Sequence, residues 1–182
     1  MEATESSKTL EDIKAMKTPA SEFFCPLGSA DGILTFGDFR LRDVDSATVL
    51  FQISEAQRSA FEASITSDEQ RIIKYNFGPG FLELRNVGAQ LSFRVGEKAI
   101  NKLRMIERHY FNKALLKSYD FQFGFCIPNS ENSWEHIYEL PEFSTERKKE
   151  MIESEWATES DTFIFVEDKL VIHQRCVYNY SL

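Results

Sequence analysis

The sequence predicts an all-β fold, in the form of an antiparallel β-sandwich or barrel. About eight short runs of alternating apolar and polar residues follow one another at regular spacing, and few segments have helical character. In the clearest run, residues 119–130, the apolar members are Phe121, Phe123, Phe125 and Ile127. A period of two is typical of a strand, so we expect these four side chains to face an apolar interior.

Alternation also marks the strands expected in the first half of the chain, at residues 39–42, 49–53, 73–77, 81–87 and 91–95. Residues 43–46 have the composition of a turn, which makes the first two strands a hairpin. Gly88 is expected to form a turn between the last two. Residues 54–69 are polar and are expected to form a loop.

The second half contains one predicted helix among further strands. Residues 144–155 are good helix formers, and Ser144 is suited to cap the helix N-terminus. Residues 163–172 are expected to form a hairpin, and residues 177–181 a closing strand. Residues 104–117 fit either a strand or a helical stripe, so the pattern leaves both open.

The chain is expected to divide into a flexible N-terminal tail, residues 1–30, and one folded domain, residues 31–182. The tail is rich in Ser, Thr, Glu and Lys, and two prolines interrupt it. Leu10, Ile13 and Met16 form a weak stripe that is typical of one short amphipathic helix. A length of 182 residues agrees with a single domain.

Composition excludes several classes of partner. The net charge is −8, and no long basic run is present, so we expect neither nucleic-acid binding nor adhesion to an anionic membrane. No apolar stretch is long enough for stable membrane insertion, and the acidic, polar first residues do not predict a secretory signal. Three scattered cysteines agree with a reducing, cytoplasmic location.

The sequence contains no recognisable catalytic or metal-binding pattern. The three histidines, His109, His136 and His173, lack metal-ligand spacing, and no phosphate loop, dinucleotide fingerprint or nucleophile elbow is present. We therefore expect no enzyme activity, no metal and no cofactor. Glu107 and His109 would share one face of a strand, as an acid–base pair or as a polar pair at the edge of an apolar interior.

An inward-facing glutamate is costly unless it finds hydrogen-bond partners, which makes Glu107 a candidate ligand-binding group. Tyr75 is a second candidate, because a tyrosine can donate from its tip while its ring packs below. Sixteen phenylalanines against eight glycines indicate an interior rich in rings. Two functions fit: a carrier whose rings line a cavity, or a β-sandwich adaptor with a solid core and no lipid cargo.

A family resemblance favours the carrier. The chain resembles the uncoordinated-119 lipid-binding chaperones, which belong with the delta subunit of rod cGMP phosphodiesterase. The resemblance covers residues 33–181, nearly the whole domain. It is carried by R-M-I-E-R-H-Y-F at 104–111, L-L-K-S-Y-D-F-Q-F-G-F-C-I-P-N-S at 115–130, F-R-L-R-D-V-D-S-A-T-V-L-F at 39–51, R-N-V-G-A at 85–89, W-E-H-I-Y at 134–138 and D-K-L-V-I-H at 168–173.

The resemblance implies an immunoglobulin-like β-sandwich whose sheets separate to hold a fatty acyl chain. It implies a carrier for N-myristoylated or N-lauroylated proteins, such as G-protein alpha subunits and ciliary cargo. An Arf-like small GTPase in the GTP state would bind the carrier and release the cargo. The implied location is the cytoplasm, with the cilium as a destination.

The resemblance also implies the residues of a lipid- and peptide-binding site. Tyr75, Glu107 and His109 match polar positions near the pocket mouth, where the first residues of a cargo peptide lie. The positions that line or border the acyl tunnel match Phe39, Leu41, Phe81, Val87, Tyr119, Phe121, Phe123, Tyr138 and Tyr178. Ile164 departs from the pattern, because close relatives tend to have tyrosine there, and a hydrogen-bonding group is then missing at the rim.

Overall fold

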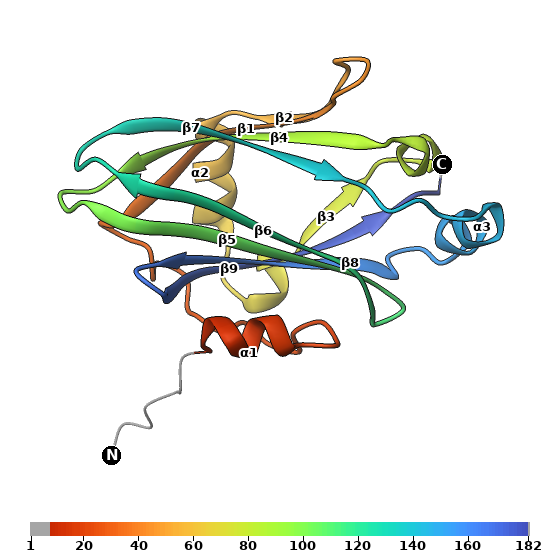
Figure 1. Ribbon diagram of the computed structural model, residues 1–182, viewed down its shortest axis with the longest axis horizontal. Helices are drawn as coiled ribbons and strands as arrows, with labels where there is room; N and C mark the ends of the chain where they lie inside the picture. The colour runs from red at the N-terminus through yellow and green to blue at the C-terminus, as the bar shows by residue number, and fades with distance from the viewer. Residues whose placement is uncertain (1–7, 182) are drawn as a thin grey trace.

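The computed structural model describes residues 8–181, which form two β-sheets packed face to face (Figure 1). One sheet has the strand order β2-β1-β4-β7, and the other has β3-β9-β8-β5-β6. The prediction of an all-β sandwich is therefore confirmed. The strands are β1 Leu34–Asp43, β2 Val49–Ile53, β3 Ile73–Asn76, β4 Asn86–Val95, β5 Ile100–Phe111, β6 Ala114–Cys126, β7 Glu131–Glu139, β8 Thr158–Val166 and β9 Lys169–Asn179.

Short helices lie at the periphery of the sandwich: α1 Leu10–Ala15, α2 Glu55–Ser64, α3 Thr145–Glu153 and the 3₁₀ turns η1 Asp68–Arg71 and η2 Pro79–Glu83. Ser144 caps α3 as predicted, since its hydroxyl accepts a hydrogen bond from the backbone N–H of Arg147. The hairpins predicted over residues 39–53 and 163–172 are confirmed as β1–β2 and β8–β9. The ambiguous residues 104–117 are strand, with a tight turn between β5 and β6.

The alternation predicted for β6 is wrong beyond its middle. Gly124 has φ +89°, and the pairing register of β6 with β5 shifts beside it. Such a bulge reverses which side chains face inward. Phe125 and Ile127 are consequently 58% and 63% exposed, while Cys126 is buried instead. A glycine inside a strand pattern is the signal for this reversal.

Three other local predictions are also wrong. Residues 81–87 are not one strand, because the 3₁₀ turn η2 ends at Glu83 and β4 begins at Asn86. Residues 54–69 contain α2, whose first turn is closed by a capping box in which Ser54 and Gln57 satisfy each other's backbone N–H groups. The polar composition of this segment reflects a helix in which no residue is fully buried. Gly88 is not in a turn, because it pairs with both Arg42 and Ile137 inside β4.

Residues 8–30 follow the outer face of the second sheet, where α1 lies across it (Figure 1). The Ile13 side chain is fully buried in a cluster with Ile106, Phe163, Phe165 and Leu170. This contact explains why β8, unlike a strand with one solvated face, is buried on both faces.

Polar contacts hold the following residues to the same face. The backbone N–H of Ala20 donates to Asp161 at 2.8 Å, and the backbone N–H of Phe24 donates to Nδ1 of His173 at 3.0 Å. His173 and Asp161 are themselves hydrogen bonded, and both are almost fully buried. The flexibility predicted for residues 1–30 stays a prediction, and residues 1–7 lie outside the described part of the chain.

We expect Ile13→Ala to lower the free energy of unfolding by about 2 kcal/mol, because it removes buried methylenes and leaves a cavity. Chemical denaturation measures this change. Lys17→Ala, at an exposed position of the same segment, is the control and should have little effect. Equal stability of the Ile13 variant and the wild type would mean that the segment behaves as a flexible tail.

Candidate functional site

A cavity of about 180 Å³ lies between the two sheets. Its lining is mostly apolar, and both sheets contribute to it: Phe39, Leu41 and Val87 come from the first, Met105 and Ile164 from the second. A cavity of about 150 Å³ is large enough to bind one benzene molecule, so this cavity has room for an apolar group of about that size.

Aromatic rings form one side of the cavity. The parallel pairing of β3 with β9 places Tyr75 opposite Tyr178, and their rings stack at 5.7 Å between centroids. Tyr75 also stacks on Phe77 at 5.3 Å, and Phe77 stacks on Phe81 at 4.5 Å. Stacked rings of this kind hold one another in place and present apolar faces to the cavity.

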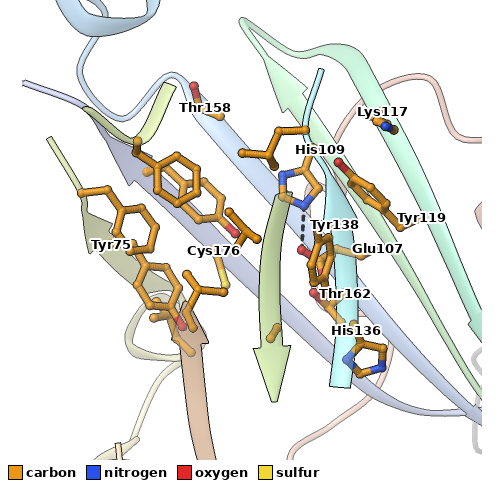
Figure 2. A pocket seen from close by; sticks show the side chains of 18 of the residues that line it. Tyr75, Glu107, His109, Lys117, Tyr119, His136, Tyr138, Thr158, Thr162 and Cys176 are labelled. Atoms are coloured by element: carbon orange, nitrogen blue, oxygen red, sulfur yellow. Dashed lines mark hydrogen bonds and ion pairs between the residues drawn. The ribbon is translucent and has the colours of Figure 1, made fainter. Parts of the chain in front are cut away.

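A polar cluster interrupts the apolar lining. Strand alternation in β5 places Glu107 and His109 on the same, inward face. Oε1 of Glu107 and Nε2 of His109 are 2.6 Å apart, and the hydroxyl of Tyr138 donates to Oε2 of Glu107 at 2.8 Å (Figure 2). Because Tyr138 belongs to the opposite sheet, this hydrogen bond crosses the space between the sheets.

The pKa of Glu107 lies below its ordinary value. Burial raises this pKa, but the hydrogen bond and charge of His109, together with the hydroxyl of Tyr138, outweigh burial. Burial also raises the pKa of Tyr138 well above 10. At neutral pH the cluster therefore combines a carboxylate, which accepts hydrogen bonds, with a protonated phenol, which donates one.

Two more tyrosines end near this cluster. The Tyr119 hydroxyl donates to the backbone carbonyl of Glu139 at 2.9 Å. The Tyr75 hydroxyl makes no hydrogen bond within residues 8–181, and burial raises its pKa, so it remains a donor at neutral pH. Tyr75 and Glu107 line the same cavity from different strands. A guest with both donors and acceptors would find partners for each among these groups.

The cavity gathers ten of the twelve residues expected to form the site: Phe39, Leu41, Tyr75, Phe81, Val87, Glu107, His109, Tyr119, Tyr138 and Tyr178. Phe121 and Phe123 are not part of the lining. Phe121 packs behind it, against Tyr138 and His136, and Phe123 packs against Phe93 and Trp134. The binding roles of all twelve residues stay a prediction.

Sequence reasoning missed several lining residues. Arg58 reaches the cavity from α2, where its Nε donates to the carbonyl of Gly37 at 2.9 Å, and a segment taken as a loop gave no reason to expect it. His136 reaches the cavity from β7. The alternation of Trp134, His136 and Tyr138 in that strand was a signal that could have identified it. Ile164 also lines the cavity and is buried.

Within residues 8–181, no group of His, Cys, Asp and Glu side chains could hold a metal ion. No helix in this part of the chain is both long and apolar enough to cross a membrane. The fold and the cavity thus define a β-sandwich binding protein.

Comparisons with known proteins agree with this class. The model of the family described as GMP-PDE, delta subunit, matches residues 31–180, so the chain belongs to that family. The chain is 40% identical over 179 residues to Protein unc-119 of Caenorhabditis briggsae, covering 98% of this chain and 82% of the relative. It is 39% identical over 179 residues to Protein unc-119 homolog B of Danio rerio, covering 95% and 74%.

A human relative, Protein unc-119 homolog B, is 44% identical over 155 residues, which is 81% of this chain and 62% of the relative. The family resemblance predicted from the sequence is therefore confirmed. Membership indicates a non-catalytic binding protein and is consistent with a lipid-binding carrier.

We expect the stability advantage of the wild type over Glu107→Gln to shrink as the pH falls below about 4.5, the ordinary pKa of this group. A carboxylate whose pKa is lowered by folding contributes stability above its unfolded pKa, and that stability is lost through the folded pKa. Urea denaturation of both proteins between neutral and acidic pH measures the difference. A constant difference across this range would contradict the lowered pKa.

Proposed function

We propose that the protein is a non-enzymatic carrier of N-acylated proteins. In this proposal the cavity binds the N-terminal myristoyl or lauroyl chain of a cargo, and the polar cluster binds the first residues of its peptide. The observation that carries the proposal is an apolar cavity between the sheets with an ionised glutamate in its lining. A solid-core adaptor would have no use for this combination.

The energetics support such a role. Burial of acyl methylenes gains roughly 0.8 kcal/mol each, so a myristoyl chain contributes on the order of 10 kcal/mol before ordering costs. A bilayer offers the same chain a similar gain, so the cavity can compete with a membrane. A lauroyl or myristoyl chain is larger than the cavity, so its binding would require the two sheets to separate further.

Selectivity would come from the peptide. The N–H groups at the start of a cargo peptide need acceptors once they leave water, and the Glu107 carboxylate can provide them. The Tyr75 hydroxyl can donate to a peptide carbonyl. The cargo would be N-myristoylated proteins such as G-protein alpha subunits and ciliary proteins, carried through the cytoplasm to membranes or cilia.

The proposal is tested by fluorescence polarisation with a labelled N-lauroyl peptide and the same peptide without the acyl group. We expect tight binding of the acylated peptide alone. Val87→Trp should reduce that affinity at least tenfold, because Val87 lines the cavity and is 2% exposed, so a larger ring would occupy the acyl site.

Val49→Trp is the matched control. Val49 is 48% exposed on β2 and lies outside the lining, so its replacement should leave acyl binding unchanged. Equal binding of acylated and bare peptide by the wild type would support the solid-core adaptor instead. Normal uptake by the Val87 variant would remove this position from the acyl site.

Release of cargo would require an effector that binds an acyl-free state more tightly than the loaded one. We propose that an Arf-like small GTPase in the GTP state is this effector, and that it docks by strand addition. The edge strands β6 and β7 are suited to docking, since β6 carries exposed Phe125, β7 carries exposed Ile137, and exposed Ile127 directly follows β6.

Stopped-flow measurement of acyl-peptide dissociation tests the effector. The GTP-loaded protein should accelerate dissociation, whereas the GDP-loaded form should not. The same rate with both forms would exclude nucleotide-controlled release by that GTPase.

A further inference from the structure

His136 places a hydrogen-bonding atom in the cavity without a partner. The residue is 3% exposed, it belongs to the lining, and its Nε2 meets no hydrogen-bond partner among the described residues. Figure 2 shows its ring near Glu107 and Thr162, on the opposite side of the polar cluster from Thr158. Buried polar side-chain atoms in folded proteins nearly always have a partner, so this atom calls for an explanation.

The surroundings of His136 give the ring little freedom to find a partner elsewhere. Its centroid lies 4.1 Å from the Trp134 ring and 4.7 Å from the Phe121 ring. Its backbone neighbour across the sheet is Ala89, which also lines the cavity and whose backbone is, among the described residues, the only protein hydrogen-bonding group that affects the His136 pKa by a hydrogen bond. The ring is therefore packed between apolar groups on the protein side and is open toward the cavity.

Burial lowers the pKa of His136 to about 4, against the opposing effects of the Glu107 charge and the Ala89 backbone. The imidazole is therefore neutral at physiological pH, and it is not an ion-pair partner of Glu107. In a neutral imidazole, Nε2 either donates or accepts one hydrogen bond, depending on the tautomer. Either way, Nε2 is suited to a neutral polar group.

Thr158 Oγ1 is the other buried polar atom without a partner among the described residues. Its environment differs, because the Tyr180 hydroxyl lies near it. Burial raises the Tyr180 pKa, and the nearby Thr158 hydroxyl opposes this rise. Small rotations can thus satisfy Thr158 within the protein. His136 Nε2 remains without a partner among the described residues although its ring is fixed by packing, and it is the stronger indication of a bound ligand.

The position of His136 indicates which chemical group of a bound ligand could pair with it. His136 and Tyr138 lie two residues apart on the inward face of β7, and Tyr138 is hydrogen bonded to Glu107. The cavity therefore has two neighbouring hydrogen-bonding positions on one wall. An amide has a donor and an acceptor on opposite sides and can satisfy both positions, whereas a thioether sulfur is only a weak acceptor.

We propose that Nε2 of His136 hydrogen-bonds the amide group that joins an acyl chain to its peptide, which makes His136 a specificity-determining residue for amide-linked chains. This inference rests on the proposed carrier function. A site built to hydrogen-bond a polar group rejects analogues that lack it, because the buried partner is then left unpaired. Chains attached through a thioether would therefore bind more weakly.

Two labelled peptides of the same sequence length test this inference: one carries an N-dodecanoyl amide, and the other carries a dodecyl chain on a cysteine sulfur. We expect His136→Leu to reduce affinity for the amide-linked peptide about tenfold, the usual size of one lost hydrogen bond to a buried group. Affinity for the thioether-linked peptide should be unchanged or higher. His136→Gln, which keeps a hydrogen-bonding side chain, should recover part of the preference.

Leu91→Ala is the matched control, because Leu91 lines the cavity through apolar contact alone and should lower both affinities alike. A preference that is the same in the wild type and His136→Leu would overturn the inference and leave the carrier function intact. Failure of the wild type to bind either peptide would instead contradict the carrier function itself.

A measurement on the wild type keeps the inference testable if the variants do not fold. The chain contains three histidines, so ¹⁵N-labelled imidazole signals can be assigned individually. The amide-linked peptide should shift the Nε2 resonance of His136, and the thioether-linked peptide should shift it much less. Equal shifts with both peptides would show that the atom does not bind the amide.

Discussion

A carboxylate between two apolar sheets is stable only if hydrogen-bond donors meet its oxygens, and this requirement shapes the centre of the protein. Glu107 satisfies it with His109 on its own strand and with Tyr138 from the opposite sheet. The second contact connects the sheets across the cavity. The spacing of the sheets at this point is thus tied to a polar contact, while stacked rings, including Tyr75 and Tyr178, line the space beside it.

The cavity is consistent with membership of the GMP-PDE, delta subunit, family and with the role of a lipid-binding carrier. Its lining contains two kinds of side chain, apolar and polar, with different effects on a ligand. Apolar side chains contribute affinity in proportion to the apolar area that they bury, and they do so for any apolar ligand. In the proposed function, a few polar groups, Glu107, Tyr138 and His136 among them, would make the interior unfavourable for a ligand that cannot pair with them. In the proposed function, affinity and selectivity therefore come from different residues of the same cavity.

Much of the fold and most of the candidate site followed from local sequence patterns and the family resemblance. The alternation of residues 39–53 and 163–172 was enough for two hairpins, and the resemblance located ten residues that now line one cavity. Two kinds of feature were missed. The segment that forms α2 has no fully buried residue and a polar composition, so it was taken as a loop and Arg58 was overlooked. A bulge at Gly124 reverses the faces of β6, and alternation alone cannot show where a strand is interrupted.

By itself, the amino-acid sequence determined that the chain forms short strands with one apolar face and that it resembles a lipid-binding family, and it predicted an inward Glu107 if residues 104–117 form a strand. These properties depend on neighbouring residues and on motifs, which a linear sequence contains in full. Only the tertiary structure decided that the sheets leave a cavity, that Tyr138 meets Glu107 from the opposite sheet, and that His136 Nε2 has no partner among residues 8–181. Each of these depends on distances between strands far apart in the chain, which no local pattern encodes.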